Sequence, residues 1–308
     1  MDSVNGISFP NLGISFSNVP TGFHLFGREI KLYAIIIGTA FLIAMFLANR
    51  EAKKTKQDTE LYVDAFLVTV IPAILGARLY YVIFEWDHYK NDLKSIFYIW
   101  NGGLAIYGGI IAGVVTLFIF SRVRKYSFGL ILDTLVPGLA LGQALGRWGN
   151  FFNREAFGEN SDGIFAMRIP TEHIYTYFSS KVTVHDGGGL SYIQVHPTFL
   201  YESVLNLLLL IVLLLYTKHK KFNGEIALGY LGGYGIIRFF VEGIRTDQLK
   251  IGSTGIAVSQ LLGMVLFIAA ILTDVIVRIC RRKKGLQELP QKAAVVQNKV
   301  ENDEKQDE

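Results

Sequence analysis

The sequence predicts an all-α integral membrane protein with about seven transmembrane helices and a small external head of mixed structure. Three observations predict this fold class. The chain of 308 residues is 51% hydrophobic and only 18% charged, with a mean hydropathy of +0.36, a balance that a soluble domain of this size does not need. Long apolar stretches recur along it, and basic residues gather in alternate loops between them.

Seven apolar stretches are long enough, at about 17 to 25 residues, to cross the hydrocarbon as helices. They cover residues 31–49, 62–84, 100–121, 128–148, 199–217, 225–243 and 254–279. A polar stretch containing Gly and Asn precedes the first of them, and basic residues follow it, unlike the order in a signal peptide. We therefore expect the first span to stay uncleaved.

Basic residues follow the first, third, fifth and seventh predicted spans. The clusters run from Arg50 to Lys56, Arg122 to Lys125, Lys218 to Lys221 and Arg278 to Lys284. The positive-inside rule places these loops in the cytoplasm, so the N-terminus is expected outside and the C-terminus inside. Residues 1–30 are then an external N-terminal segment, 31–279 a membrane catalytic domain that includes the head at 149–198, and 280–308 a disordered cytoplasmic tail.

Within the head, residues 174–178 and 181–185 alternate in the manner of short strands. The three histidines of this region have spacings that match no metal motif. The single cysteine, Cys280, excludes a disulfide framework, and we interpret it as a small apolar residue rather than a nucleophile or a lipidated thiol. We expect no metal, no cofactor and no nucleic-acid partner.

Ionisable side chains inside a span are costly, so they are kept where they are paired, solvated or functional. In the predicted orientation, a set of polar residues reaches the outer half of the membrane: Arg78, Arg147, Arg238, Glu242, Tyr33, Asn101, Tyr107, His196 and Glu202. Tyr234, Arg238, Glu242 and Arg245 share one helix face by their spacing. Arg238 and Glu242 could form only an internal ion pair, and Arg78 and Arg147 could snorkel to the interface.

Three arginines in this layer, Arg78, Arg147 and Arg238, carry more positive charge than Glu242 can balance. Arginine suits the bidentate binding of phosphate, so we expect an anionic ligand, and a phospholipid headgroup is the abundant anion there. A transporter for an anionic substrate is the alternative, because intramembrane Arg and Glu also mark translocation pathways. That alternative predicts charges at several depths and an internal repeat, and no repeat is evident.

The segment Gly146-Arg-Trp-Gly-Asn-Phe-Phe-Asn-Arg-Glu-Ala-Phe-Gly158 closely resembles the signature of the bacterial prolipoprotein diacylglyceryl transferase family. Four further segments agree in content and order: Gly76 to Leu79, Gly102 to Gly109, His196 to Glu202, and Tyr234 to Arg245. The resemblance covers about residues 20–280 and implies an enzyme of the bacterial cytoplasmic membrane. Such an enzyme moves the diacylglyceryl group of phosphatidylglycerol onto the lipobox cysteine in the signal peptide of a preprolipoprotein, and it releases glycerol phosphate.

The resemblance implies a set of site residues in this chain, and we add to it nearby residues of the same segments. The catalytic residues are expected to be Arg147, Arg238, Glu242, Glu155 and Tyr107, and the substrate-binding residues Tyr33, Arg78, Asn150, Gly158, Tyr234, Arg245 and His196. The two catalytic arginines would clamp the phosphate and stabilise its developing charge. Tyr107 stands where many members have histidine, and a phenol is a poor base at neutral pH. The base therefore stays open between Glu242 and Glu155, and His196 could instead be structural.

Overall fold

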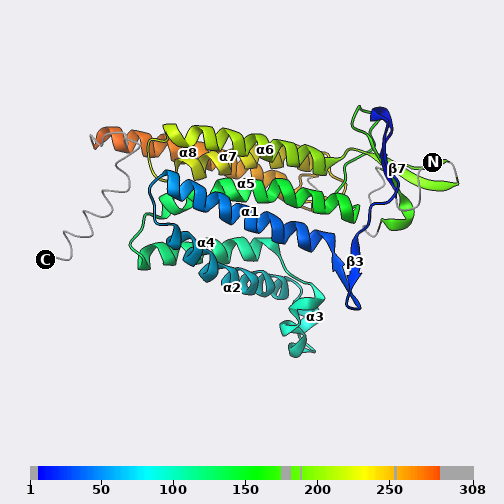
Figure 1. Ribbon diagram of the computed structural model, residues 1–308, viewed down its shortest axis with the longest axis horizontal. Helices are drawn as coiled ribbons and strands as arrows, with labels where there is room; N and C mark the ends of the chain where they lie inside the picture. Colours follow the sequence, from blue (N-terminus) through cyan, green and yellow to red (C-terminus); the bar gives the residue numbers. More distant parts are fainter. Residues whose placement is uncertain (1–5, 175–181, 188, 253–254, 285–308) are drawn as a thin grey trace. The chain divides into compact units, whose positions relative to one another are not determined.

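The computed structural model describes residues 6–174, 182–187, 189–252 and 255–284, and this part of the chain is mostly helical with a small sheet region (Figure 1). The helices are α1 (Leu32–Lys54), α2 (Thr59–Phe84), α3 (Trp86–Tyr89), α4 (Ile106–Val123), α5 (Phe128–Asn153), α6 (Thr198–Tyr216), α7 (Glu225–Gly243) and α8 (Val258–Lys283). The strands are β1 (Ile7–Phe9), β2 (Ile14–Phe16), β3 (Gly22–Leu25), β4 (Arg28–Lys31), β5 (Met167–Pro170), β6 (Val184–Gly187) and β7 (Leu190–Val195).

Six helices of the described chain are long and apolar enough to cross a membrane: α1, α2, α4, α5, α6 and α8. Each matches a predicted span in order, which confirms an all-α membrane fold. The remaining predicted span, 225–243, coincides with α7, which is helical over the same residues. Helix α7 is less apolar than the six membrane-spanning candidates because it contains the charged residues Glu225, Arg238 and Glu242.

The third predicted span, 100–121, begins too early. Helix α4 starts at Ile106, and Asn101 belongs to a short 3₁₀ helix, η3 (Ile99–Asn101), that precedes it. Gly102 and Gly103 separate the two with φ of +88° and +74°, a backbone conformation that interrupts a right-handed helix. Apolar composition continues through this turn, so hydropathy alone could not locate the helix start.

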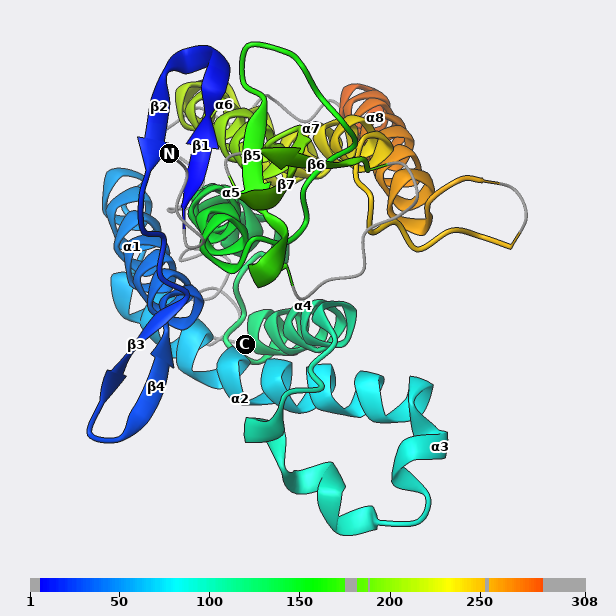
Figure 2. The ribbon, with the colours of Figure 1, turned by 90° about the vertical axis from the view of Figure 1, so that its right-hand side faces the viewer.

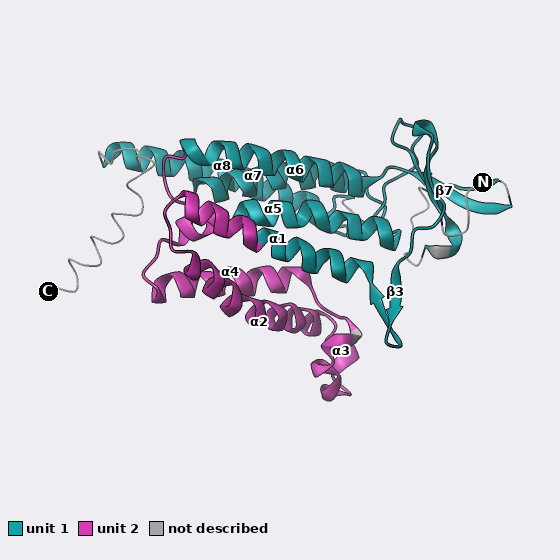
Figure 3. Ribbon diagram, in the orientation of Figure 1, with its two compact units in different colours: residues 1–44, 136–219, 225–287 teal, residues 45–135, 220–224, 288–308 magenta. Residues whose placement is uncertain are grey.

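The chain divides into two compact units, coloured separately in Figure 3. Unit 1 comprises residues 1–44, 136–219 and 225–287, and unit 2 comprises residues 45–135, 220–224 and 288–308. Helices α1 and α5 each contribute residues to both units. The head and the helices that follow it belong to unit 1, whereas α2 and α4 belong to unit 2.

Unit 1 contains a five-stranded antiparallel sheet in the order β2-β1-β5-β7-β6, whose strands are labelled in the turned view of Figure 2. The predicted composition of the head, residues 149–198, is therefore only partly right. Two strands of the observed sheet come from the N-terminal segment, and Ser8 of β1 pairs with Arg168 of β5. Residues 22–31 form a separate hairpin, β3-β4. The predicted strand at 174–178 falls almost wholly outside the described residues, and the one at 181–185 is shifted to β6.

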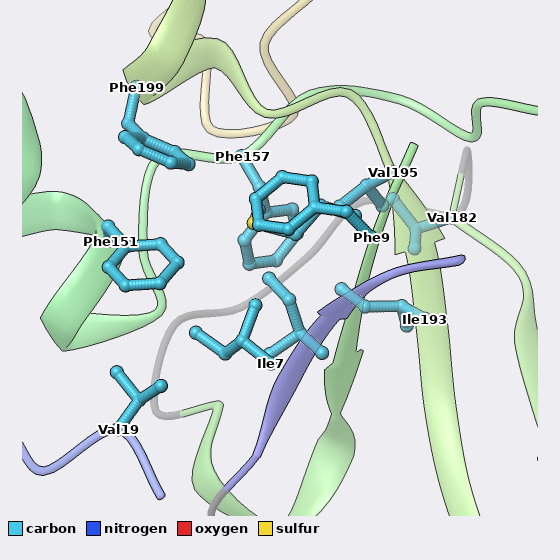
Figure 4. Packing of buried hydrophobic residues seen from close by; sticks show 11 residues of the cluster. Ile7, Phe9, Val19, Phe151, Phe157, Val182, Ile193, Val195 and Phe199 are labelled. Atoms are coloured by element: carbon cyan, nitrogen blue, oxygen red, sulfur yellow. The ribbon is translucent and has the colours of Figure 1, made fainter. Parts of the chain in front are cut away.

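A hydrophobic core joins this sheet to the ends of two helices in unit 1. Figure 4 shows Phe151 of α5 and Phe199 of α6 beside side chains from β1 and β7, among them Ile7 and Ile193. Ile7 and Ile193 are at most 1% exposed, so they form a packed interior rather than a surface cap. Burial of this apolar area fixes the end of α5 and the start of α6 relative to the sheet.

In unit 2, α2 and α4 cross at small residues. A Cβ atom at Gly108 would lie 2.3 Å from the carbonyl oxygen of Gly76, so only glycine permits this approach. Unit 1 has an equivalent crossing of α7 and α8, where a Cβ at Gly235 would lie 2.5 Å from the oxygen of Gly263. Close packing of helices, which glycine spacing typically indicates, is therefore present in both units.

The expected tail at 280–308 begins too early. Residues 280–283, including Cys280, belong to the last turn of α8. Residues 285–308 lie outside the described part of the chain. Basic side chains in this last turn, Arg281, Arg282 and Lys283, face the negative end of the helix dipole, which favours continuation of the helix.

Candidate functional site

Glu202 lies between two of the predicted arginines and bridges them. Its Oε1 accepts a hydrogen bond from Nη2 of Arg147 at 2.7 Å, and its Oε2 accepts one from Nη1 of Arg238 at 3.4 Å. The side chain of Glu202 is 1% exposed, whereas those of Arg147 and Arg238 are 21% and 17% exposed. One buried carboxylate on α6 therefore connects guanidiniums from α5 and α7.

The stripe predicted on α7 continues this network. Nη2 of Arg238 lies 2.5 Å from Oε2 of Glu242, and Nε of Arg245 lies 3.9 Å from the same oxygen. Ser259 of α8 donates to Oε1 of Glu242 at 2.7 Å, so both carboxylate oxygens are engaged. Spacing by four and three residues places these side chains on one face, as predicted.

Arg245 pairs with Asp247, a residue outside the predicted site. Its Nε and Nη2 donate to the two oxygens of Asp247 at 2.9 and 2.6 Å. Burial alone would raise the pKa of Asp247, but the hydrogen bonds and charge of Arg245 outweigh it and hold that pKa below its ordinary value. Burial would likewise lower the pKa of Arg245, and the pairing with Asp247 instead raises it.

We call Arg147, Glu202, Arg238, Glu242, Arg245 and Asp247 the arginine cluster. Its three guanidiniums are matched by three carboxylates, so the predicted excess of positive charge is wrong for this cluster. Glu202 and Asp247 account for the difference, and Arg78 belongs to unit 2. Net charge therefore does not indicate an anionic ligand at this cluster, whereas the partly exposed side chains of Arg147 and Arg238 are available to bind one.

A chain of hydrogen bonds leads from the arginine cluster past the end of α5. Nη1 of Arg147 donates to Oδ1 of Asn150 at 3.2 Å, and Nδ2 of Asn150 donates to Oε1 of Glu155 at 2.9 Å. Asn153 donates to the same oxygen at 3.1 Å. Within the described chain Glu155 makes no ion pair. These contacts bring Arg147, Asn150 and Glu155 together, as the sequence predicted.

The loop that follows α5 holds Glu155 through an unusual backbone. Arg154 and Ala156 on either side of it have φ of +53° and +57°, a region that non-glycine residues rarely adopt. Arg154 is 3% exposed and donates to the carbonyl of Val19 at 2.7 Å, while the hydroxyl of Thr198 donates to the carbonyl of Ala156. Tertiary hydrogen bonds therefore stabilise a loop that propensity alone would not form.

Gly158 and His196 lie together at the junction of three chain segments. The amide of Gly158 donates to the carbonyl of His196 at 2.9 Å, and Gly158 forms a β-bridge with Arg245. A Cβ atom at Gly158 would lie 2.8 Å from Cβ of His196 and 2.9 Å from the carbonyl oxygen of Ile244. Both residues therefore have a packing role, which agrees with the structural interpretation of His196.

Two tyrosines of unit 1 flank the arginine cluster. Tyr33 packs on α5, where a Cβ atom at Gly149 would lie 2.3 Å from its ring. Tyr234 stacks on Tyr230 with ring centroids 5.9 Å apart, and it interacts electrostatically with Arg147, Arg238 and Glu202. Both predicted residues are thus in unit 1, one beside the signature helix and one in contact with the cluster.

Arg78 and Tyr107 belong to unit 2. Arg78 is 6% exposed and donates to the backbone carbonyls of Ser95, Ile96, Gly102 and Gly103 at 2.7 to 2.9 Å. The N–H groups of its guanidinium thus anchor the segment between α2 and α4 by hydrogen bonds. Tyr107, in the first turn of α4, is 39% exposed, and its ring centroid lies 6.5 Å from that of Tyr80.

Glu202 was expected among the polar residues of the outer half of the membrane, with no role of its own. A carboxylate within the apolar stretch of α6 was the available signal, because such a group is kept only where a partner compensates it. Asp247 had no such signal, since it lies in a polar loop. Among the described residues, no group of three or more His, Cys, Asp or Glu side chains could hold a metal ion.

Comparison with known proteins agrees with the motif. A family model described as prolipoprotein diacylglyceryl transferase matches residues 20–276. The chain is 43% identical to the phosphatidylglycerol–prolipoprotein diacylglyceryl transferase of Listeria monocytogenes serotype 4b over 252 residues. The aligned region covers 82% of this chain and 87% of the relative. The enzyme of the same name from Lactobacillus acidophilus is 43% identical over 266 residues, 86% of this chain and 90% of the relative. That from Finegoldia magna is 41% identical over 254 residues, 82% of this chain and 93% of the relative.

Proposed function

The chain belongs to the prolipoprotein diacylglyceryl transferase family, and on this basis we propose that it transfers the diacylglyceryl group of phosphatidylglycerol to the cysteine thiol of a prolipoprotein. It is a multi-pass bacterial membrane protein with six apolar helices in its described part. The comparisons do not favour the transporter alternative. Within this reaction, the acceptor is the lipobox cysteine of a signal peptide, and the products are a thioether and glycerol phosphate.

The observation that carries this proposal is the convergence of Arg147 and Arg238, from α5 and α7, on Glu202, while the side chains of both arginines stay partly exposed. Two guanidiniums held together by one buried group form a site for phosphate oxygens. The substrate thiolate attacks the glycerol carbon that carries the phosphate, a carbon–sulfur bond forms, and the carbon–oxygen bond to phosphate breaks. Arg147 and Arg238 stabilise the charge that accumulates on the leaving phosphate.

The thiol proton needs an acceptor, and the contacts favour Glu155 over Glu242. Both oxygens of Glu242 are occupied, by arginine on one side and Ser259 on the other. Among the described residues, the side chain of Glu155 accepts hydrogen bonds from the amides of Asn150 and Asn153, both at Oε1, and Asn150 links it to the phosphate clamp. We assign Tyr33 and Tyr234, which belong to unit 1 with the clamp, to positioning of the lipid headgroup rather than to proton transfer.

The positive-inside pattern supports an active site near the outer leaflet, with the N-terminus outside and the C-terminus in the cytoplasm. Phosphatidylglycerol of the outer leaflet and an exported signal peptide are both accessible there. An accessibility assay checks this topology: a cysteine introduced at Ser17 in the Cys280→Ser background should react with a membrane-impermeant maleimide in intact cells. Labelling only after lysis would contradict the orientation.

The activity itself is tested with purified protein, phosphatidylglycerol that carries labelled acyl chains, and a peptide with a lipobox cysteine. We expect the label on the peptide and release of glycerol phosphate. The matched peptide with serine in place of cysteine should receive none, because its hydroxyl is a far weaker nucleophile than a thiolate. Absence of transfer, or equal transfer to the serine peptide, would contradict the proposal.

A further inference from the structure

We propose that Glu202 is a positioning residue that holds Arg147 and Arg238 from their buried side and sets the charge of the phosphate clamp. This inference rests on the proposed function. It assigns Glu202 no contact with the reacting atoms. Instead, Glu202 acts through the two arginines, keeping them aligned for the leaving phosphate and preventing them from retaining the product.

The difference in exposure between the partners supports this role. The side chain of Glu202 is 1% exposed, and its two oxygens contact Arg147 and Arg238, whose side chains are 21% and 17% exposed. A ligand can therefore reach the side chains of Arg147 and Arg238 more readily than the carboxylate that joins them. A carboxylate behind two cations fixes their spacing, as the outer partners of metal-binding side chains fix their ligands.

The turn of α6 that carries Glu202 is itself anchored. The buried amide of Asn206 donates to the backbone carbonyl of Glu202 at 2.8 Å. The neighbouring Ser203 donates to the carbonyl of Ala144 at 2.8 Å and accepts from Trp148 at 3.2 Å. Both contacts of Ser203 are to α5, so Glu202 is attached to the helix that also carries Arg147. The carboxylate is therefore the fixed member of this triad.

The charge of Glu202 matters because the phosphate gains charge during the reaction. The phosphodiester of the lipid carries one negative charge, whereas a phosphate monoester such as glycerol phosphate carries about −1.5 to −2 near neutral pH. Without Glu202, the arginine cluster would have one excess positive charge and would bind this product more tightly. With Glu202, the cluster is balanced, so it can bind the substrate and still release the product.

Glu202→Gln tests the charge at nearly constant shape, and Glu225→Gln is a matched control. Glu225 is also buried, and it pairs with Arg278 and Tyr216 at the other end of α7. Each variant is assayed as full-length protein in detergent or vesicles for folding, for glycerol phosphate binding and for kcat and KM with phosphatidylglycerol. Binding of glycerol phosphate is independent of activity, so it judges the inference even if no transfer occurs.

We expect Glu202→Gln to bind glycerol phosphate about tenfold more tightly than the wild type, through loss of one nearby negative charge. Its kcat should fall by about 10- to 100-fold, the usual effect of losing a group that orients a binding side chain. KM should not rise. Glu225→Gln should match the wild type in glycerol phosphate affinity, kcat and KM. The two variants are compared at equal concentrations of folded protein.

Glu202→Asp separates position from charge, and it also serves if Glu202→Gln does not fold. It keeps the charge but shortens the side chain, so product affinity should stay at the wild-type value while kcat falls. A folded Glu202→Gln protein that binds glycerol phosphate no more tightly than Glu225→Gln would overturn the inference. If the wild type shows no transfer while Glu202→Gln still binds glycerol phosphate more tightly, the proposed function fails and the role of Glu202 in the clamp stands.

Discussion

The guanidinium of Arg78 lies over the ring of Tyr89, with its Cζ 5.1 Å from the ring centroid, and its nitrogens donate to four backbone carbonyls of the segment between α2 and α4. Replacement by lysine leaves several of these carbonyls without a donor, at a cost of about 1–3 kcal/mol for each buried one. We expect Arg78→Lys to lower the Tm of the purified protein clearly. An unchanged Tm with lost transfer would instead support direct contact between Arg78 and substrate.

Arg147 should be required for chemistry more than for folding, because its side chain is partly exposed. We expect Arg147→Ala to reduce kcat by about 10²- to 10³-fold, the effect of removing a group that stabilises a developing anion. Arg147→Lys should recover only part of this loss, since an ammonium cannot make the two-pronged contact. Near-normal activity in the alanine variant, at a normal yield in the membrane, would contradict the phosphate clamp.

Substitution of the two candidate bases distinguishes them. We expect Glu155→Gln to lower kcat by about 10²- to 10⁴-fold, which is the range for loss of a general base. The loss should shrink as the pH rises toward that at which the substrate thiol ionises by itself, about 8.5. Glu242→Gln should lower activity without this recovery at high pH, because it disturbs Arg238. A pH-dependent recovery confined to Glu242→Gln would reverse the assignment.

Gly158 is expected to be intolerant of any side chain because three segments meet there. A methyl group would lie 2.8 to 2.9 Å from neighbouring atoms, and such overpacking costs about 1–3 kcal/mol. Gly158→Ala should therefore reduce Tm and the yield of folded protein, with activity falling in parallel. Gly142→Ala is the matched control, because no atom of another segment lies within 4 Å of the place that its Cβ would occupy. Equal stability of the two variants would exclude the packing role.

The pair of Arg245 and Asp247 should stabilise the protein over the whole neutral range. Because the folded-state pKa of Asp247 is lowered, its contribution is complete above the ordinary carboxyl value of 3.8 and is lost only as the pH falls through the lower folded value. The Tm difference between the wild type and Asp247→Asn should thus stay constant from pH 7 to 5. A difference that disappears within that interval would contradict the pairing.

Much of the helical architecture was predictable because it depends on local composition. The stretch at 225–243 became α7 with the same bounds, and the charged stripe on it was visible as a spacing of four and three residues. The association of Arg147, Asn150 and Glu155 was predictable too, since all three belong to one short segment. These features depend on residues close together in the sequence.

Features that depend on distant partners were not predictable in this way. The pairing of Glu202 with Arg147 joins residues 55 apart, and no periodicity within one helix specifies it. Arg78 was interpreted as a ligand for phosphate because an unpaired intramembrane cation suggests an anion, yet its partners are backbone carbonyls. Every segment offers carbonyls, so sequence alone cannot identify the ones that accept.

The pairing of Ser8 with Arg168 has a consequence for biosynthesis. Strand β1 finds β5 only after about half of the chain has left the ribosome, and until then it has β2 as its sole partner in the sheet. A two-stranded hairpin is at best marginally stable in water. Completion of the sheet is therefore a late, long-range step of folding, which follows synthesis of α1, α2, α4 and α5. An N-terminal fusion would burden this step first, so tags are better placed at the C-terminus.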